Sequence, residues 1–167
     1  ADNAEELILK LSDILRYLFD NSSNETIKIS EEIDFLKKFT ELIEARFKDK
    51  IQFRWQNFLK KDQVEIPVLL LQPLIENSIK HAWKNDGKSL LIKIGIEENE
   101  KGIIFTVKDN GQGIDSNRLK KIPLKGHALA NIYDRLYLFY NKSDLLKINS
   151  EDGRGTTVSI FLPESKI

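Results

Sequence analysis

Apolar residues recur at helical spacing in two stretches near the start of the chain. The first stretch, from residue 4 to about residue 19, places an apolar stripe on one helical face: Leu7, Leu11, Ile14, Leu15 and Leu18. The second runs from Ser30 to about Lys48, because Ser30 suits an N-cap and Glu31 and Glu32 suit the first turn. Both stretches are therefore predicted to be amphipathic helices.

Two further helices are predicted later in the chain. Pro67 suits the first turn of a helix that runs to about Trp83. Since a proline inside a helix removes a hydrogen bond, this helix either begins after Pro73 or bends there. The last helix opens at Gly126 and directs an apolar set inward, namely Leu129, Ile132, Leu136 and Tyr140.

Alternating apolar and polar residues predict strands between these helices. Short strands are expected at 26–29 and 51–55, longer ones at 90–96 and 103–107, and a closing hairpin at 145–148 and 156–162. This order predicts an α+β fold, in which a mainly antiparallel sheet is covered by helices on one side to form a two-layer sandwich. The helix at 4–19 lies outside this domain, and its exposed apolar stripe requires a partner.

Composition narrows the possible functions. The chain of 167 residues has 26 Lys and Arg against 26 Asp and Glu, so the usual electrostatic case for nucleic acid or an anionic membrane is absent. It has no cysteine, which excludes disulfides, thiolate catalysis and cysteine-based zinc sites. Its most apolar run, 66–75, is too short to span a bilayer. Because it has no methionine, we expect it to be a piece of a longer protein or a processed product.

The first candidate site is Asp109-Asn-Gly-Gln-Gly113, which follows directly on a predicted strand. Its glycines let backbone approach a flat or anionic ligand, and Asp109 at the strand end can accept a hydrogen bond from that ligand. A simple turn remains the alternative, because Asn-Gly is an ordinary turn former. An EF-hand fits poorly, since the second acidic ligand and the closing glutamate are missing.

The second candidate is Glu76-Asn-Ser-Ile-Lys-His81 on the third predicted helix. Asn77 and His81 are one turn apart and Lys80 lies beside them, so all three project from one face. Asparagine supplies an oxygen suited to Mg²⁺, lysine pairs with phosphate, and histidine stacks or hydrogen-bonds. The alternative is a solvated helix face that happens to contain a histidine.

Two weaker candidates complete the set. Gly126-His-Ala-Leu-Ala-Asn131 opens a helix, where free N–H groups bind phosphate. Gly153-Arg-Gly-Thr-Thr157 lies at the hairpin, where a glycine-rich turn is the alternative. Walker, dinucleotide-binding and protein-kinase signatures are absent from the sequence, and two histidines without cysteine make a zinc hydrolase a poor fit.

Taken in order, these four motifs resemble the N, G1, G2 and final boxes of the GHKL ATPases, a superfamily that includes DNA gyrase, MutL and histidine kinases. Leu11-Ser-Asp-Ile-Leu-Arg-Tyr-Leu18, Ile29-Ser-Glu-Glu-Ile33, Glu44-Ala-Arg-Phe47 and the segment 66–77 resemble the LytS-type sensor histidine kinases. The resemblance covers essentially the whole chain. It implies the Bergerat (GHKL) fold at 22–167, preceded at 1–21 by the C-terminal helix of an incomplete dimerisation region.

The resemblance implies roles for residues around the adenine and the metal. Asn77 would ligate the Mg²⁺ that bridges the ATP phosphates. Asp109 would accept a hydrogen bond from the adenine amino group, and Thr156 would share its water network. Gly111 and Gly113 would give the base and ribose room.

It also implies a phosphate side of the site. Lys80 would approach the phosphates and His81 the adenine or ribose. Glu76, the acidic residue beside the magnesium ligand, is assigned with Lys80 to catalysis. The remaining nucleotide-binding assignments, under a lid spanning about 115–125, are Lys125, Gly126, His127, Ala128 and Leu129. Ala128 stands where the family has the second glycine of this box, and its side chain would slightly restrict how closely the backbone approaches the phosphates.

One departure from the family decides what this chain does alone. The family's phosphorylated histidine belongs to a motif expected upstream of Ala1, and the histidines present, His81 and His127, both fall in the nucleotide motifs. The resemblance therefore implies a protein-histidine kinase domain that does not phosphorylate itself in isolation. It would relay phosphate to a response regulator, form a homodimer through the upstream helix, and be the cytoplasmic domain of a plasma-membrane sensor.

Two rival hypotheses remain open. An anti-sigma-type protein-serine kinase shares the nucleotide fold, but the Leu-Arg-Tyr helix and the Leu-Gln-Pro-Leu-Ile-Glu-Asn run argue against it. A degenerate nucleotide-sensing or dimerisation module is suggested by Ala128. ATP-driven machines such as gyrase fit least, because their large transducer domains have no counterpart here.

Overall fold

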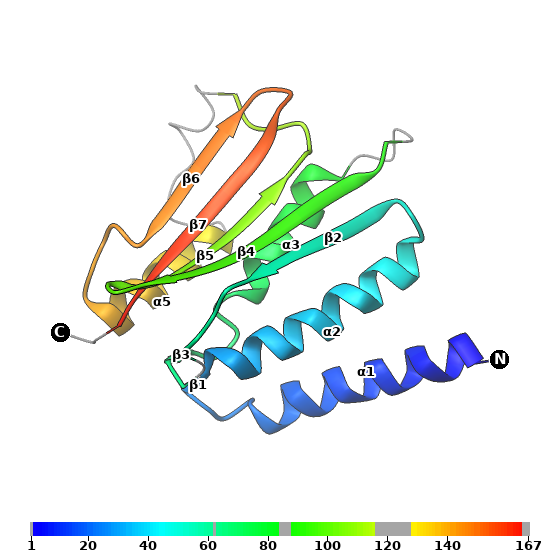
Figure 1. Cartoon of the computed structure of the whole chain (residues 1–167), viewed down its shortest axis with the longest axis horizontal. Helices are drawn as coiled ribbons and strands as arrows, with labels where there is room; N and C mark the ends of the chain where they lie inside the picture. Colours follow the sequence, from blue (N-terminus) through cyan, green and yellow to red (C-terminus); the bar gives the residue numbers. More distant parts are fainter. Residues whose placement is uncertain (1, 62, 84–87, 116–127, 165–167) are drawn as a thin grey trace.

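The structure, a computed structural model, describes residues 2–61, 63–83, 88–115 and 128–164 (Figure 1). Its helices are α1 (Asp2–Asp20), α2 (Ile29–Phe47), α3 (Gln72–Ala82) and α5 (Ala128–Tyr140). Its strands are β1 (Thr26–Lys28), β2 (Ile51–Asn57), β3 (Glu65–Pro67), β4 (Leu90–Asn99), β5 (Gly102–Asp109), β6 (Leu146–Glu151) and β7 (Gly155–Pro163).

Five strands form the main sheet in the order β2-β4-β5-β7-β6. β2 and β4 run parallel, and every other neighbouring pair is antiparallel. Strict alternation buries one face, with Ile92, Ile94 and Ile96 of β4 at 1% exposure or less. The other face is polar, and Lys93 of β4 lies directly opposite Lys108 of β5. Helices α2, α3 and α5 lie on the apolar face (Figure 1), which confirms the two-layer α+β prediction.

The third helix begins later than Pro67. Residues 65–67 form β3, which pairs with β1, and Ile66 is fully buried in the hydrophobic core. α3 then starts at Gln72 with Pro73 in its first turn, where no N–H is needed. The prediction that Pro67 lies in the first turn of this helix is therefore wrong. The helix also does not begin after Pro73, as one alternative had it, but one residue before it, so that Pro73 itself lies in the first turn.

The start of the second helix also differs from its prediction. α2 begins at Ile29, its N-cap is Lys28, and no side chain caps it. Ser30 thus lies inside the helix and is not its cap. Glu31 and Glu32 do occupy the first turn. Glu32, however, is fully buried, so it is not a solvent-exposed charge at the N-terminus of the helix dipole. Backbone pairing of β1 with β3 sets this start, because it aligns residues 26–28 directly before the helix.

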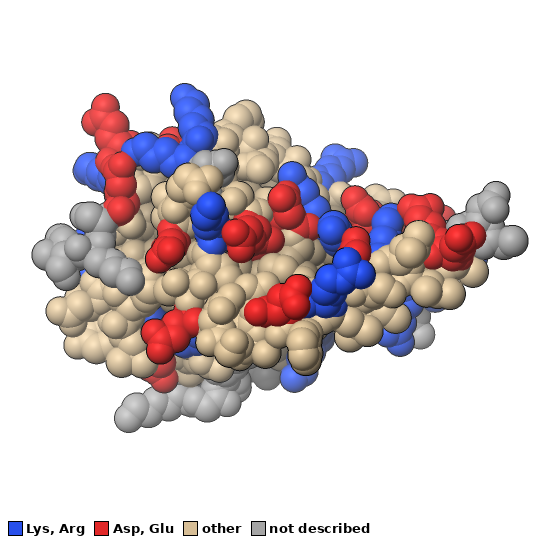
Figure 2. Space-filling model, turned by 90° about the horizontal axis from the view of Figure 1, so that it is seen from below, with Lys and Arg blue, Asp and Glu red and all other residues tan. Residues whose placement is uncertain are grey.

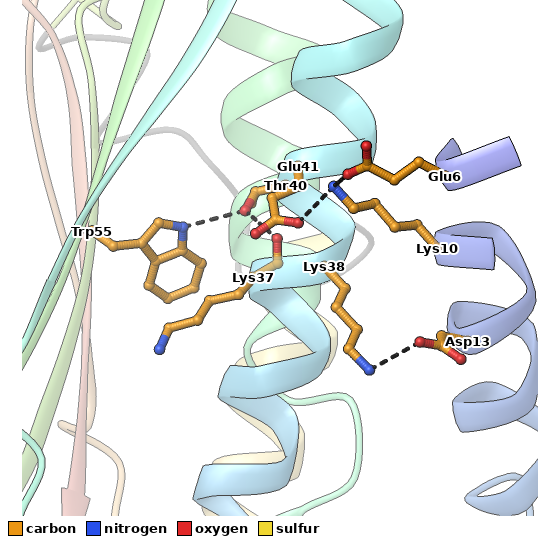
Figure 3. A network of polar contacts seen from close by, with 8 residues as sticks. All are labelled: Glu6, Lys10, Asp13, Lys37, Lys38, Thr40, Glu41 and Trp55. Atoms are coloured by element: carbon orange, nitrogen blue, oxygen red, sulfur yellow. Dashed lines mark hydrogen bonds and ion pairs between the residues drawn. The ribbon is translucent and has the colours of Figure 1, made fainter. Parts of the chain in front are cut away.

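α1 packs against α2 and does not stand alone. Tyr17 stacks on Phe35 of α2 with ring centroids 4.2 Å apart, and Ile14 is buried in the same contact. Ion pairs join Lys10 to Glu41 at 3.0 Å and Lys38 to Asp13 at 3.2 Å (Figure 3). On its other side α2 is tied to the sheet, because the Trp55 indole of β2 donates to the Thr40 hydroxyl.

Only part of the predicted stripe on α1 stays open. Ile14 and Leu18 face the body of the protein, whereas Leu11 and Leu15 are exposed together with Ile8 and Phe19. Figure 2 views this side of the molecule and shows acidic and basic side chains interspersed, without a patch of one sign. In the part of the chain that the structure describes, no helix is long and apolar enough to cross a membrane.

Candidate functional site

β5 ends at Asp109, whose side chain is only 5% exposed. Its Oδ1 accepts hydrogen bonds from the N–H of Gly111 at 2.9 Å and of Thr156 at 3.1 Å. Burial raises the pKa of the Asp109 carboxyl, and these two N–H groups partly oppose that rise. The hydrogen bonds of the Asp109 side chain to other described residues both end on Oδ1, so its second oxygen, Oδ2, remains available to another donor.

The glycines that follow Asp109 allow the loop to pack closely on its neighbours. A Cβ on Gly111 would collide with Ala82 at the end of α3. Gly113 has a φ of +70°, and a Cβ there would collide with the carbonyl oxygen of Glu151. Close contact with α3 and with the β6–β7 hairpin therefore explains why both positions are glycine. Their assignment to the base and ribose stays a prediction.

Ser150 links this loop to the hairpin, and the sequence motifs did not identify it. Its hydroxyl accepts from the N–H of Ile114 at 2.8 Å and lies 2.8 Å from the Thr156 hydroxyl and 3.0 Å from the Gly155 carbonyl. Thr156 is therefore held at both its N–H and its hydroxyl. The only sequence signal for Ser150 is its place just before the glycine-rich turn.

Asn110 and Gln112, also missed, fix the other side of the loop. Asn110 Oδ1 accepts from the N–H of Leu91 at 2.7 Å, which ties the loop to the start of β4. Gln112 Nε2 donates to the carbonyl of His81 at 3.3 Å, which ties it to the end of α3. Both lie inside the predicted motif, where the sequence drew attention to Asp109 and the glycines.

The candidate residues of α3 differ in exposure. Glu76, Lys80 and His81 are exposed, and Glu76 accepts a hydrogen bond from Gln72 Nε2 at 2.9 Å. Asn77 is half-buried, and its amide nitrogen is enclosed without a hydrogen-bond partner among the described residues. A buried polar group in this state is costly, so it is suited to meeting a ligand. A half-turn of the amide would present the oxygen at the same place.

The phosphate side of the predicted site is only partly described. Lys125, Gly126, His127 and nearly all of the lid (116–125) lie outside the described residues. α5 begins at Ala128, and Leu129 is half-buried against the core. α5 contacts α3, the helix that carries Asn77.

The arrangement suits a base with an exocyclic amino group and an attached anion. The free oxygen of Asp109 can accept from the amino group, and Lys80 on α3 can pair with phosphate. Within the described ranges, no cluster of three or more His, Asp or Glu side chains could hold a metal ion by itself. A cation here would therefore take part of its coordination from the ligand, as Mg²⁺ does with nucleotide phosphates.

Two family descriptions match this chain. Residues 1–51 match the histidine kinase family, and residues 62–166 match the family described as histidine kinase-, DNA gyrase B-, and HSP90-like ATPase. The first match includes α2, whereas the sequence placed a domain boundary after residue 21. That boundary stays a prediction.

The chain is also similar to individual proteins. It is 31% identical over 175 residues to the sensor protein LytS of Staphylococcus haemolyticus, covering 100% of this chain and 30% of that protein. It is 30% identical over 164 residues to the sensor histidine kinase YesM of Bacillus subtilis, covering 96% of this chain and 28% of that protein. The chain thus spans less than a third of the length of the curated relatives it matches.

Solved structures show the same fold. The histidine kinase domain from a blue-light activated histidine kinase of Erythrobacter litoralis is similar with a TM-score of 0.61 at 20% identity. The similarity covers 98% of this chain and 76% of that chain.

Proposed function

Because the chain belongs to the family of histidine kinase-, DNA gyrase B- and HSP90-like ATPases, we propose that it is the ATP-binding catalytic domain of a sensor histidine kinase. It would transfer the γ-phosphate of ATP to a histidine outside these 167 residues, for relay to a response regulator. The proposal rests on the geometry of Asp109. This buried residue has one carboxylate oxygen fixed by two backbone N–H groups and the other available to accept a hydrogen bond from a ligand.

Asp109 supports recognition of adenine through its orientation. Both backbone N–H groups bind Oδ1, so the carboxylate cannot rotate freely and Oδ2 points in one direction. A charged acceptor in a buried site makes a strong hydrogen bond and rejects bases that lack the amino donor. Thr156 is bonded to the same carboxylate through its N–H, and its hydroxyl, which contacts Ser150, would bind a bridging water.

Asn77 is the described residue that fits a magnesium ion. Its amide is enclosed and unpartnered, and amide oxygens are ordinary ligands of this cation. Bound Mg²⁺ would neutralise phosphate charge during transfer. Lys80 would pair with the phosphates, and Glu76 would orient or deprotonate the incoming group.

The remaining parts of the proposal concern partners. The exposed apolar residues of α1, led by Leu11 and Leu15, would pair with an upstream helix that carries the acceptor histidine and forms a homodimer. The parent protein would be a membrane sensor, with this domain on the cytoplasmic side. The name of the relatives, sensor protein, supports the sensor part of this proposal.

Radiolabelled ATP tests the proposed activity. Incubated with [γ-³²P]ATP and Mg²⁺, the present chain should stay unlabelled, because His81 and His127 belong to the nucleotide motifs. A chain extended upstream through the preceding helix should acquire a phosphate that acid removes and base does not. Acid-stable label would indicate a serine kinase instead, and base-stable label on the present chain would contradict the placement of the acceptor.

A further inference from the structure

A tight turn precedes α3, the helix that carries Asn77. Leu69 has a φ of +53°, and Leu70 and Leu71 are fully buried. The N-cap residue, Leu71, offers no side-chain cap, and the first turn of α3 contains no acidic residue. The helix therefore lacks, within its own sequence, the acceptor that its free N-terminal N–H groups need.

Glu32 of α2 supplies that acceptor from across the core. Its Oε1 accepts from the N–H of Leu71 at 2.7 Å and of Gln72 at 3.2 Å, and its Oε2 accepts from the N–H of Leu70 at 3.2 Å. The side chain is fully buried. Three backbone donors and the positive end of the helix dipole partly offset the cost of burying a carboxylate in this position.

Arg135 of α5 binds the same turn through its carbonyl groups. Its Nη1 donates to the Leu69 carbonyl at 2.9 Å, and its Nη2 donates to the Val68 carbonyl. The Glu32 carboxylate thus accepts hydrogen bonds from the N–H groups of this turn, and the Arg135 guanidinium donates hydrogen bonds to its carbonyl groups. Residues far apart in sequence, on α2 and on α5, together determine where α3 begins.

We propose that Glu32 is a positioning residue of the nucleotide site, acting through α3. Asn77 lies five residues after Gln72, so a change in how the helix starts rotates and shifts its amide relative to Asp109 on β5. Arg135 has the same positioning role, because its two hydrogen bonds hold the carbonyl groups of the turn in place when nucleotide binds to α3. The inference rests on the proposed function, since it assigns Asn77 to bound Mg·ATP.

The test combines two measurements on Glu32→Gln, with Glu31→Gln as the matched control. Glu31 is exposed, has the same charge and precedes Glu32 in the same turn. Hydrogen exchange without nucleotide reports the cap, and calorimetric titration with ATP, in Mg²⁺ and in EDTA, reports the site. Ile33→Val, a buried change on the same helix, controls for lost stability alone.

For Glu32→Gln we expect the amides of residues 70–72 to exchange at least about tenfold faster, and Mg·ATP to bind about tenfold more weakly. The loss of affinity should shrink in EDTA, because Asn77 then has no metal to ligate. Glu31→Gln and Ile33→Val should bind as the wild type does. If Glu32→Gln fails to fold, Arg135→Lys replaces it, since lysine keeps the charge but cannot reach both carbonyls at once.

Two outcomes overturn the inference. Unchanged exchange at 70–72 would show that Glu32 does not cap α3, and faster exchange with unaltered affinity would show that the cap does not position the site. A wild-type chain that binds no ATP would instead refute the proposed function. In that case the exchange measurement alone would still decide whether Glu32 caps the helix.

Discussion

The substitution Asp109→Asn separates the structural role of this side chain from its proposed role in binding adenine. An asparagine oxygen can still accept from the N–H groups of Gly111 and Thr156, which now bind Oδ1 at 2.9 and 3.1 Å. These bonds lose only their charge assistance, so we expect a stability loss of about 1 kcal/mol. The free Oδ2, however, becomes an NH₂ group that faces another donor.

The effect on nucleotide binding should be larger. A hydrogen bond to a charged group contributes about 1.5–3 kcal/mol, which corresponds to about 10- to 100-fold in the dissociation constant. Isothermal titration with ATP, in Mg²⁺ and at constant ionic strength, measures this difference. Asp144→Asn is the matched control, because it removes the same charge from an exposed position before β6.

Equal affinity of Asp109→Asn and the wild type would remove Asp109 from the adenine site. A large loss of thermal stability accompanied by lost binding would leave the side chain with a structural role only. A loss for ATP that is absent for inosine triphosphate, whose base has no amino group, would identify the contact directly.

Three further predictions follow from other parts of the structure. Asn77→Ala should weaken ATP binding in Mg²⁺ and much less in EDTA, since the lost ligand matters only with the ion present; equal losses in calorimetric titrations under both conditions would exclude the metal role. Gly113→Ala should destabilise the chain by about 2 kcal/mol or more in urea unfolding, because its φ is +70° and a Cβ would collide with the Glu151 carbonyl. Gly153→Ala is the control. Its φ is +75° but a Cβ there would meet no atom within 4 Å, so it should cost about half as much. Burial raises the pKa of Glu32 from 4.5 to about 7, against the opposing effect of its three N–H bonds. The folded chain therefore holds a proton that the unfolded chain has released, and the free energy of unfolding should fall by up to about 3 kcal/mol between these pH values and be level above them. Urea titrations over this range should show that slope in the wild type and not in Glu32→Gln.

The fold could be predicted largely because its periodicities are long and regular. β4 and β5 alternate over most of their length, and the polar face of the sheet is therefore visible in the sequence. Residues 65–67 were not predicted as a strand, because Pro67 was assigned to the first turn of the following helix. The pairing of β3 with β1 is a tertiary contact, and it also displaced the expected starts of two helices.

The site was predicted as a set of motifs but not as a geometry. Asp109 and Thr156 are 47 residues apart, and only the pairing of β5 with β7 brings them into contact. Glu32 illustrates the limit more sharply. From the sequence it is an acidic residue in the first turn of its own helix, whereas in the structure it caps a different helix about 40 residues later.

The separation of Asp109 from Thr156 also has a consequence for folding kinetics. β4 and β5 are joined by a tight connection from Asn99 to Gly102, so this hairpin closes a short loop. β7 must then add to β5 across a much longer loop, whose closure is slower. The hydrogen bond between Thr156 and Asp109 forms only after that last strand has joined. Nucleotide would therefore slow the unfolding of the domain and leave its folding rate unchanged.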